Sequence, residues 1–168
     1  MKFKKVVALC KKSKRFILHD CDGFQMLSDG AAAYELIGHP TYDEDSLRMV
    51  AEVTDDTVSI EQRFEIPFNI NDSCAEDEEC ELFSTTFGYR GAVLQPVRSV
   101  SGIAFLDSKY LAPFSGEDYT VWKRQSLYVI KVGMLAKAFV CPMAIQNDVS
   151  LVKELNQIIC FVTNQKAK

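Results

Sequence analysis

No stretch of the sequence approaches the roughly 18 consecutive apolar residues that a membrane-spanning helix needs. Glycine and proline are scarce, with eight and five among 168 residues, which excludes a collagen-like or linker-dominated chain. What is present is the composition of a folded globular protein, 48% hydrophobic and 25% charged, and this composition excludes disorder. We therefore expect a single domain over residues 1–168 that does not bind a membrane.

Residues and motifs typical of enzymes are also few. The only histidines are His19 and His39, and the sequence has no phosphate-binding loop, H-E-x-x-H motif, EF-hand loop or G-x-S-x-G motif. Cys74 and Cys80 are separated by five residues with no histidine nearby, which is not the spacing of a zinc site. We expect a protein that is not an enzyme and that holds no metal ion and no cofactor.

The apolar stretch near the start of the sequence covers only residues 6–10. A secretory signal peptide needs about 7–15 apolar residues followed by a small-residue cleavage site. A cytoplasmic location is therefore predicted. In that compartment the six cysteines are expected to be thiols rather than disulfides.

The net charge of −4 conceals a strong segregation of charge along the chain. Residues 1–15 carry seven basic side chains and no acid. Residues 43–81 carry fourteen acids against two arginines, whereas residues 82–168 carry ten bases against five acids. The basic start and the acidic middle are expected to be separate surfaces, or partners of each other.

The basic start is predicted to form a helix over residues 3–12. Its apolar residues recur at the spacing of one helical face, and its lysines cluster on the opposite side. Such a lysine face is either solvated or a sequence-independent contact for the phosphates of duplex DNA. The candidate nucleic-acid-binding residues are Lys4, Lys5, Lys11, Lys12 and Arg15.

The sharpest acidic cluster is expected in a polar loop over residues 71–81. The cluster is either a solvated loop or a surface that docks a basic protein in the manner of nucleic-acid phosphates. The candidate partner-binding residues are Glu76, Asp77, Glu78, Glu79 and Glu81.

Hydrophobic periodicity predicts an α+β fold with one or more mainly antiparallel sheets, because most connections are too short for parallel crossovers. Helices are expected at residues 3–12, 43–53 and 148–164, with a helical turn at 107–111. Strands are expected at 16–18, 24–27, 31–37, 55–70, 83–89, 92–100, 103–106, 119–123, 127–132 and 135–141. Residues 127–140 are apolar on both alternating faces, so they are buried by the chain itself or by a second subunit; the sequence leaves a homo-oligomer open.

Three segments resemble a group of proteins of similar length that are encoded in prophages and mobile elements of gut bacteria. The segments are 34–44 (YELIGHPTYDE), 102–113 (GIAFLDSKYLAP) and 134–138 (MLAKA), followed by Pro142. The resemblance covers most of the chain. It implies a phage or mobile-element origin and carries no particular activity with it.

A weaker resemblance is architectural. Residues 3–37 read as a helix and three strands, and residues 103–141 as a strand, a helical turn and three strands; the second pattern is similar to the repeating unit of DNA sliding clamps, whose basic helices line the DNA channel. The resemblance makes 1–70 and 82–145 candidate halves of a pseudo-repeat. Pro113 shortens the second helix, and the C-terminal helix is additional to the clamp pattern.

These observations favour a non-enzymatic protein that binds a macromolecule, with duplex DNA or a basic host protein as partner. The first hypothesis is a clamp-like accessory protein of DNA metabolism. The second is an acidic inhibitor or modulator, of an anti-defence type, whose span 43–81 occupies a nucleic-acid-binding surface of a host protein. The third hypothesis, which is the least favoured, is a small phosphohydrolase. It is considered because Asp20-Cys-Asp22-Gly23 resembles the first motif of haloacid-dehalogenase-type phosphatases.

Overall fold

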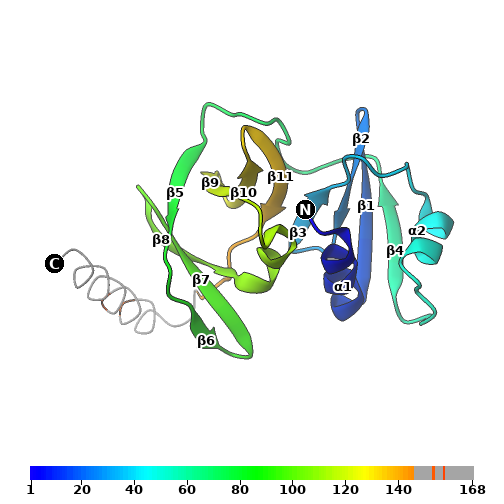
Figure 1. The fold of residues 1–168 in the computed structure, drawn as a ribbon, viewed down its shortest axis with the longest axis horizontal. Helices are drawn as coiled ribbons and strands as arrows, with labels where there is room; N and C mark the ends of the chain where they lie inside the picture. The colour runs from blue at the N-terminus through cyan, green and yellow to red at the C-terminus, as the bar shows by residue number, and fades with distance from the viewer. Residues whose placement is uncertain (146–152, 154–156, 158–168) are drawn as a thin grey trace.

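The computed structural model describes residues 1–145 together with Lys153 and Gln157. Within this part, the prediction of an α+β fold with a mainly antiparallel sheet is confirmed. The strands follow the order β4-β1-β2-β3-β11-β10-β9-β5-β7-β6, and β8 pairs with β7 (Figure 1). The helix expected at 148–164 otherwise lies outside the described residues. No described helix has the length and apolar character needed to cross a membrane.

The helical elements are few and short. They are α1 (Phe3–Ser13), α2 (Glu44–Val50) and the 3-10 turns η1 (Ser108–Tyr110) and η2 (Ala112–Phe114). The strands are β1 (Arg15–Cys21), β2 (Phe24–Ser28), β3 (Ala32–Glu35), β4 (Ser59–Arg63), β5 (Glu78–Leu82), β6 (Phe87–Tyr89), β7 (Ala92–Ser99), β8 (Gly102–Asp107), β9 (Thr120–Arg124), β10 (Leu127–Val132) and β11 (Leu135–Val140). Every strand pair is antiparallel except β1 with β4.

One face of the sheet carries the helical elements and the main core. α1 buries Val6, Val7 and Cys10 on this face, next to β1 and β2. Phe114 of η2 and Leu47 of α2 are fully buried in the same core. Figure 1 shows η1 and η2, in yellow-green, beside the first turn of α1. The basic helix is therefore fixed against a segment more than 100 residues away in the sequence.

The opposite face of the sheet is covered by the connection between β4 and β5, residues 64–77, which we call the strap. Ile66, Phe68 and Ile70 of the strap pack on a second cluster that includes Val129 of β10 and Phe139 of β11. The rings of Phe68 and Phe139 lie 4.9 Å apart. Both faces of β10 are thus covered by this chain.

The strap explains why the expected strand at 55–70 is too long. Only Ser59–Arg63 pairs in the sheet. Pro67 has no N–H to give to a ladder, and the apolar residues around it bury themselves flat on the sheet instead of extending its edge.

A second correction concerns the acidic loop expected at 71–81. Its last residues form β5, while only Phe87–Tyr89 of the strand expected at 83–89 is a strand. Opposite charges face each other across β5: Glu78 lies opposite Lys123 of β9, and Glu81 opposite Arg98 of β7. Such cross-strand pairs stabilise a strand whose own composition is unfavourable.

Candidate functional site

The basic residues of α1 are positioned by its buried face. Val6, Val7 and Cys10 point into the core, and at about 100° per residue Lys5 and Lys12 lie on the opposite side of the helix, with Lys4 and Lys11 at the border between the two sides. Lys4, Lys5, Lys11 and Lys12 are all exposed, as the helical periodicity predicts. The first turn of α1 carries no acidic residue, so nothing on the helix itself neutralises this face.

Most basic side chains of residues 1–145 have a partner, and three of the four exceptions lie on α1. In residues 1–145, four basic side chains have no hydrogen bond, ion pair or ring contact with another described residue: Lys4, Lys11, Lys12 and Arg48. By contrast, Lys109 pairs with Asp107 and Lys137 with Glu35. Three unpartnered cations therefore share one helix.

The other two candidate residues of the basic start have partners. The ammonium group of Lys5 donates to the carbonyl oxygen of Ala112 at 3.0 Å and to the hydroxyl oxygen of Ser115 at 2.8 Å. Arg15 lies at the start of β1 and pairs with Glu61 of β4 at 3.4 Å. Lys5 thus borders the exposed lysines, whereas Arg15 faces the acidic side of the molecule.

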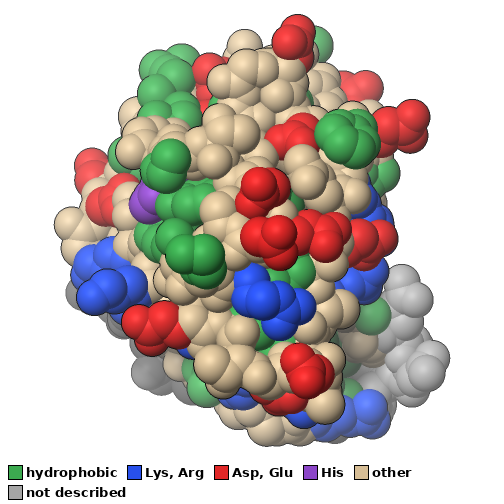
Figure 2. Space-filling model, turned by 90° about the vertical axis from the view of Figure 1, so that its right-hand side faces the viewer, with side chains coloured by type: hydrophobic (Ala, Val, Ile, Leu, Met, Phe, Trp, Pro, Cys, Tyr) green, Lys and Arg blue, Asp and Glu red, His purple; other side chains and the backbone are tan. Residues whose placement is uncertain are grey.

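The structure divides the acidic span 43–81 between two regions. Figure 2 shows acidic side chains gathered on the side of the molecule that carries α2 and β4. The exposed acids of this region are Asp43, Glu44, Asp45, Glu52, Asp55, Asp56 and Glu65. β5 lies between β9 and β7, with six strands between it and β4 in the order of the sheet. The span does not form one continuous surface.

The candidate partner-binding residues of the second region also have different surroundings. Glu79 is exposed, Glu76 accepts a hydrogen bond from Gln125, and Glu81 pairs with Arg98. Glu78 accepts a hydrogen bond from the backbone N–H of Val100. Asp77 does not lie on the surface, because its side chain is only 5% exposed.

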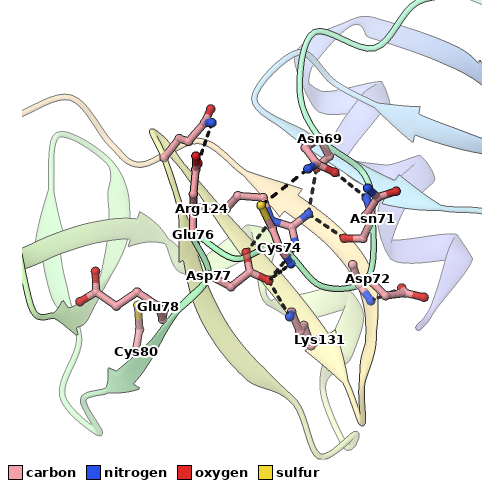
Figure 3. Close-up of polar contacts among 12 residues, drawn as sticks. Asn69, Asn71, Asp72, Cys74, Glu76, Asp77, Glu78, Cys80, Arg124 and Lys131 are labelled. Carbon is pink, nitrogen blue, oxygen red and sulfur yellow. Dashed lines mark hydrogen bonds and ion pairs between the residues drawn. The ribbon is translucent and has the colours of Figure 1, made fainter.

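Asp77 lies at the centre of a buried ionic cluster with Arg124 of β9 and Lys131 of β10. Its two carboxylate oxygens accept from Arg124 at 2.6 and 2.7 Å, and one also accepts from Lys131 at 2.8 Å. Figure 3 shows the Asp77 carboxylate turned toward both cations, with Glu78 apart from them. Nη1 of Arg124 donates to the carbonyl oxygens of Asn69 and Asn71, so the cluster fastens the strap to the sheet.

The pKa of Asp77 follows from this geometry. Burial opposes ionisation, but the hydrogen bonds and charges of Arg124 and Lys131 outweigh it and lower the pKa of Asp77 to about 2. The carboxylate is therefore ionised at neutral pH, and its role is to compensate two buried cations rather than to meet a partner.

The motif Asp20-Cys21-Asp22-Gly23 is a hairpin. The chain turns at Asp22 and Gly23 directly from β1 into antiparallel β2, rather than into the helix that follows the parallel strand of the phosphatase family. Asp20 accepts hydrogen bonds from the side-chain amides of Gln25 and Gln62, which occupy both of its oxygens. The geometry gives Asp20 a structural role in joining β1, β2 and β4.

His19 fastens the other end of the strap. Its ring is buried, and its Nδ1 lies 3.4 Å from the carbonyl oxygen of Glu65, a contact in which the ring N–H donates. Burial lowers the pKa of His19 below its ordinary value of 6.5. The neutral form is therefore the one that the fold accommodates.

This burial predicts a pH dependence of stability. Because the unfolded chain binds a proton at His19 more readily than the folded chain, the contribution is present above the ordinary pKa of 6.5 and is lost as the pH falls below it. We expect the free energy of unfolding, measured with urea, to fall between about pH 7 and pH 5. His19→Asn should flatten this slope. Equal slopes in wild type and His19→Asn contradict the prediction.

The described residues offer no cluster of three or more His, Cys, Asp or Glu side chains that could hold a metal ion. Cys74 and Cys80 are both free thiols. Cys80 is buried in β5, and burial raises its pKa above the ordinary value, so it is not an activated nucleophile.

No protein-family model, curated protein or solved structure matches the chain. The resemblances to prophage-encoded proteins and to sliding clamps therefore stay predictions from the sequence.

Two polar features of the site were not identified from the sequence. The lysine face is visible as a helical period, but the contact of Lys2 and Lys5 with Ser115 joins residues 113 and 110 positions apart. The only local signal at Ser115 is the turn composition of Pro113, Ser115 and Gly116. The pairing of Asp77 with Arg124 and Lys131 likewise has no local signal.

Proposed function

We propose that the protein is a non-enzymatic DNA-binding accessory protein of phage or mobile-element origin, and that the exposed face of α1 contacts the backbone of duplex DNA. The observation that carries the proposal is the set of unpartnered lysines on α1: Lys4, Lys11 and Lys12. Exposed cations without carboxylate partners are free to replace the counterions of a polyanion.

The spacing of the lysines suits an extended row of phosphates. Lys4 and Lys11 are seven residues apart, as are Lys5 and Lys12, which places each pair about 10 Å apart along the helix axis. One helix can therefore reach more than one phosphate. Since no aromatic side chain is interleaved with these lysines, contact with the backbone is favoured over stacking on bases.

The clamp-like form of this proposal is supported by the arrangement of the helical elements. α1 and the η1–η2 pair lie side by side on one face of a sheet, and the chain from β8 to β11 follows the order strand, helical turns and three strands. The two 3-10 turns are shorter than the second helix of the clamp pattern, and Lys109 of η1 is paired with Asp107. The lysines of α1 thus carry the DNA contact.

The alternative, an acidic modulator that binds a basic host protein, has less support. It requires the span 43–81 to act as one surface, but the fold separates its two regions and buries Asp77. An acidic modulator acting through the α2–β4 side alone is the form of this proposal that the fold permits.

The proposal is tested by fluorescence anisotropy of labelled duplex DNA titrated with the protein at several salt concentrations. We expect affinity to fall steeply with salt, and the triple variant Lys4/Lys11/Lys12→Glu to abolish binding at moderate salt. With three neutral glutamines instead, the slope of log affinity against log salt should fall by about 3, since each phosphate contact contributes about 0.9.

The matched control is Arg48→Glu, which reverses an equally unpartnered cation that lies on α2 instead of α1. It should leave DNA affinity within about twofold, because a cation outside the interface contributes only through screened long-range electrostatics. Absence of binding at low salt, or equal losses for Arg48→Glu and Lys11→Glu, overturns the proposal.

A further inference from the structure

Two ammonium groups converge on one neutral oxygen beside the first turn of α1. Lys2 Nζ donates to Ser115 Oγ at 3.0 Å, and Lys5 Nζ donates to the same atom at 2.8 Å. The two cations are therefore no farther apart than the sum of these distances. All three side chains are exposed. Like charges this close repel each other unless an anion joins them.

The backbone holds this arrangement in place. The N–H of Lys2 donates to the carbonyl oxygen of Pro113 at 2.8 Å, and Lys5 also donates to Ala112. Phe114, which lies between Pro113 and Ser115 in the sequence, is fully buried in the core. Gly116 follows Ser115 with a φ of +88°, and a Cβ at that position would lie 4.0 Å from the ammonium group of Lys2. The two lysines and Ser115 thus stand on a fixed junction of α1 and η2.

No described carboxylate neutralises this pair. Glu117, the acid nearest to Ser115 in the sequence, is paired with the amino group of Met1. Asp118 makes no ion pair with a described residue. The first turn of α1 has no acid, and the helix dipole adds positive potential at the same end. The charge left at the junction is positive.

The hydrogen-bonding capacity of Ser115 completes the argument. A hydroxyl has two acceptor positions and one donor. Lys2 and Lys5 fill both acceptor positions, and the Ser115 hydroxyl donates to no described residue. Its hydrogen and the remaining ammonium hydrogens are therefore all donors. A group of donors only, with two positive charges, is suited to an oxyanion with several acceptor oxygens.

We infer that Lys2, Lys5 and Ser115 form a seat for one phosphate group, and that this group is a backbone phosphate of the duplex contacted by Lys4, Lys11 and Lys12. The inference rests on the proposed function for the identity of the phosphate. Lys5 and Lys12 are seven residues apart and so lie on the same side of the helix. A duplex bound to the exposed lysines therefore also lies next to the seat.

The seat is tested on the full chain with ¹H–¹⁵N correlation spectra during titration with inorganic phosphate at constant ionic strength, with chloride as reference. We expect saturable shifts of the amide signals of Ser115 and Gly116. Lys5→Gln should weaken phosphate binding about tenfold, since it removes a charge-assisted hydrogen bond. Ser115→Ala, which leaves the lysines in place, should weaken it less but measurably. Arg48→Gln, which removes a cation on α2 outside the proposed interface, is the control and should leave it unchanged.

A short duplex added to the phosphate complex then distinguishes the seat from the function. Displacement of phosphate by the duplex, with the phosphate-induced shift of the Gly116 amide weakened in Ser115→Ala and weakened further in Lys5→Gln, supports the whole inference. Duplex binding through α1 without any saturable phosphate shift at Ser115 overturns the seat and leaves the proposed function standing. A saturable phosphate shift that the duplex does not displace overturns the assignment to a DNA phosphate, and the anisotropy experiment then decides on the function separately.

Discussion

Asp77→Asn is expected to lower the free energy of unfolding by about 3–5 kcal/mol, the range found when one partner of a buried ion pair is removed. The variant keeps the shape of the side chain but leaves Arg124 and Lys131, at 3% and 6% exposure, without a compensating charge. The strap should be destabilised as well, because Arg124 also donates to the carbonyl oxygens of Asn69 and Asn71. For a chain of this length, such a loss lowers Tm by roughly 10 °C.

Urea unfolding at pH 7 measures the effect, and Glu81→Gln is the matched control. Glu81 also pairs with an arginine, Arg98, but both partners are substantially exposed, so this variant should cost less than about 1 kcal/mol. The pKa of Asp77, about 2 against an ordinary 3.8, adds a second readout. Its stabilisation is present above pH 3.8 and is lost as the pH falls toward 2, so wild type and variant should converge in acid. Equal stability of Asp77→Asn and Glu81→Gln at neutral pH would contradict the role of the cluster.

The elements that periodicity identifies are those whose packing is decided locally. α1 repeats its apolar residues at helical spacing, and the hairpin of β1 and β2 is marked by Asp22 and Gly23. In both cases the residues that specify the element lie within it or beside it. The class of the fold follows from counting such elements.

β5 shows what local patterns miss. Its sequence, EECEL, is poor in strand-forming residues and predicts a solvated loop. β9 and β7 stabilise the strand by placing Lys123 and Arg98 opposite its glutamates. Arg98 lies 17 residues after Glu81, and Lys123 lies 45 residues after Glu78. Because this pairing depends on charges from distant residues, the sequence of β5 alone does not predict it.

The prediction for the strap is wrong in the opposite way: the sequence predicts a strand where the structure has none. Ile66, Phe68 and Ile70 alternate like a strand, and alternation alone predicts one. The structure instead lays these side chains on the outer face of β10 and β11, where burial satisfies them without a ladder. Alternation reports that every second residue is buried, and it does not say what buries it.

In the candidate site, too, some features follow from the local sequence and others depend on the tertiary fold. Exposure of Lys4, Lys11 and Lys12 follows from the helical period and could be predicted. The partners of Lys5 and Arg15, and the burial of Asp77, depend on elements brought together by the tertiary fold. Which charges are free, and therefore available to a partner, is a property of the fold and not of the local sequence.

Phe114→Ala is expected to cost about 3–5 kcal/mol of unfolding free energy, the range for removing a fully buried phenylalanine ring. The ring lies in the core with centroids 6.2 Å from Tyr34 and 5.9 Å from Tyr119. The cavity opens beneath η2, at the point where Lys2 donates to Pro113. We therefore expect the loss to be accompanied by loosening of the junction between α1 and η2.

Hydrogen exchange separates this local effect from a general loss of stability. If Phe114 anchors the junction, the amide of Lys2, which is held by Pro113, should exchange faster in Phe114→Ala than the overall destabilisation requires. Phe114→Leu fills most of the cavity and should restore both stability and protection in large part. Leu94→Ala, in a separate core cluster, is the control for a cavity elsewhere and should leave the Lys2 amide protected in proportion to global stability. Equal relative exchange of the Lys2 amide in Phe114→Ala and Leu94→Ala would show that α1 is held without Phe114, and that the lysine face does not depend on η2 for its position.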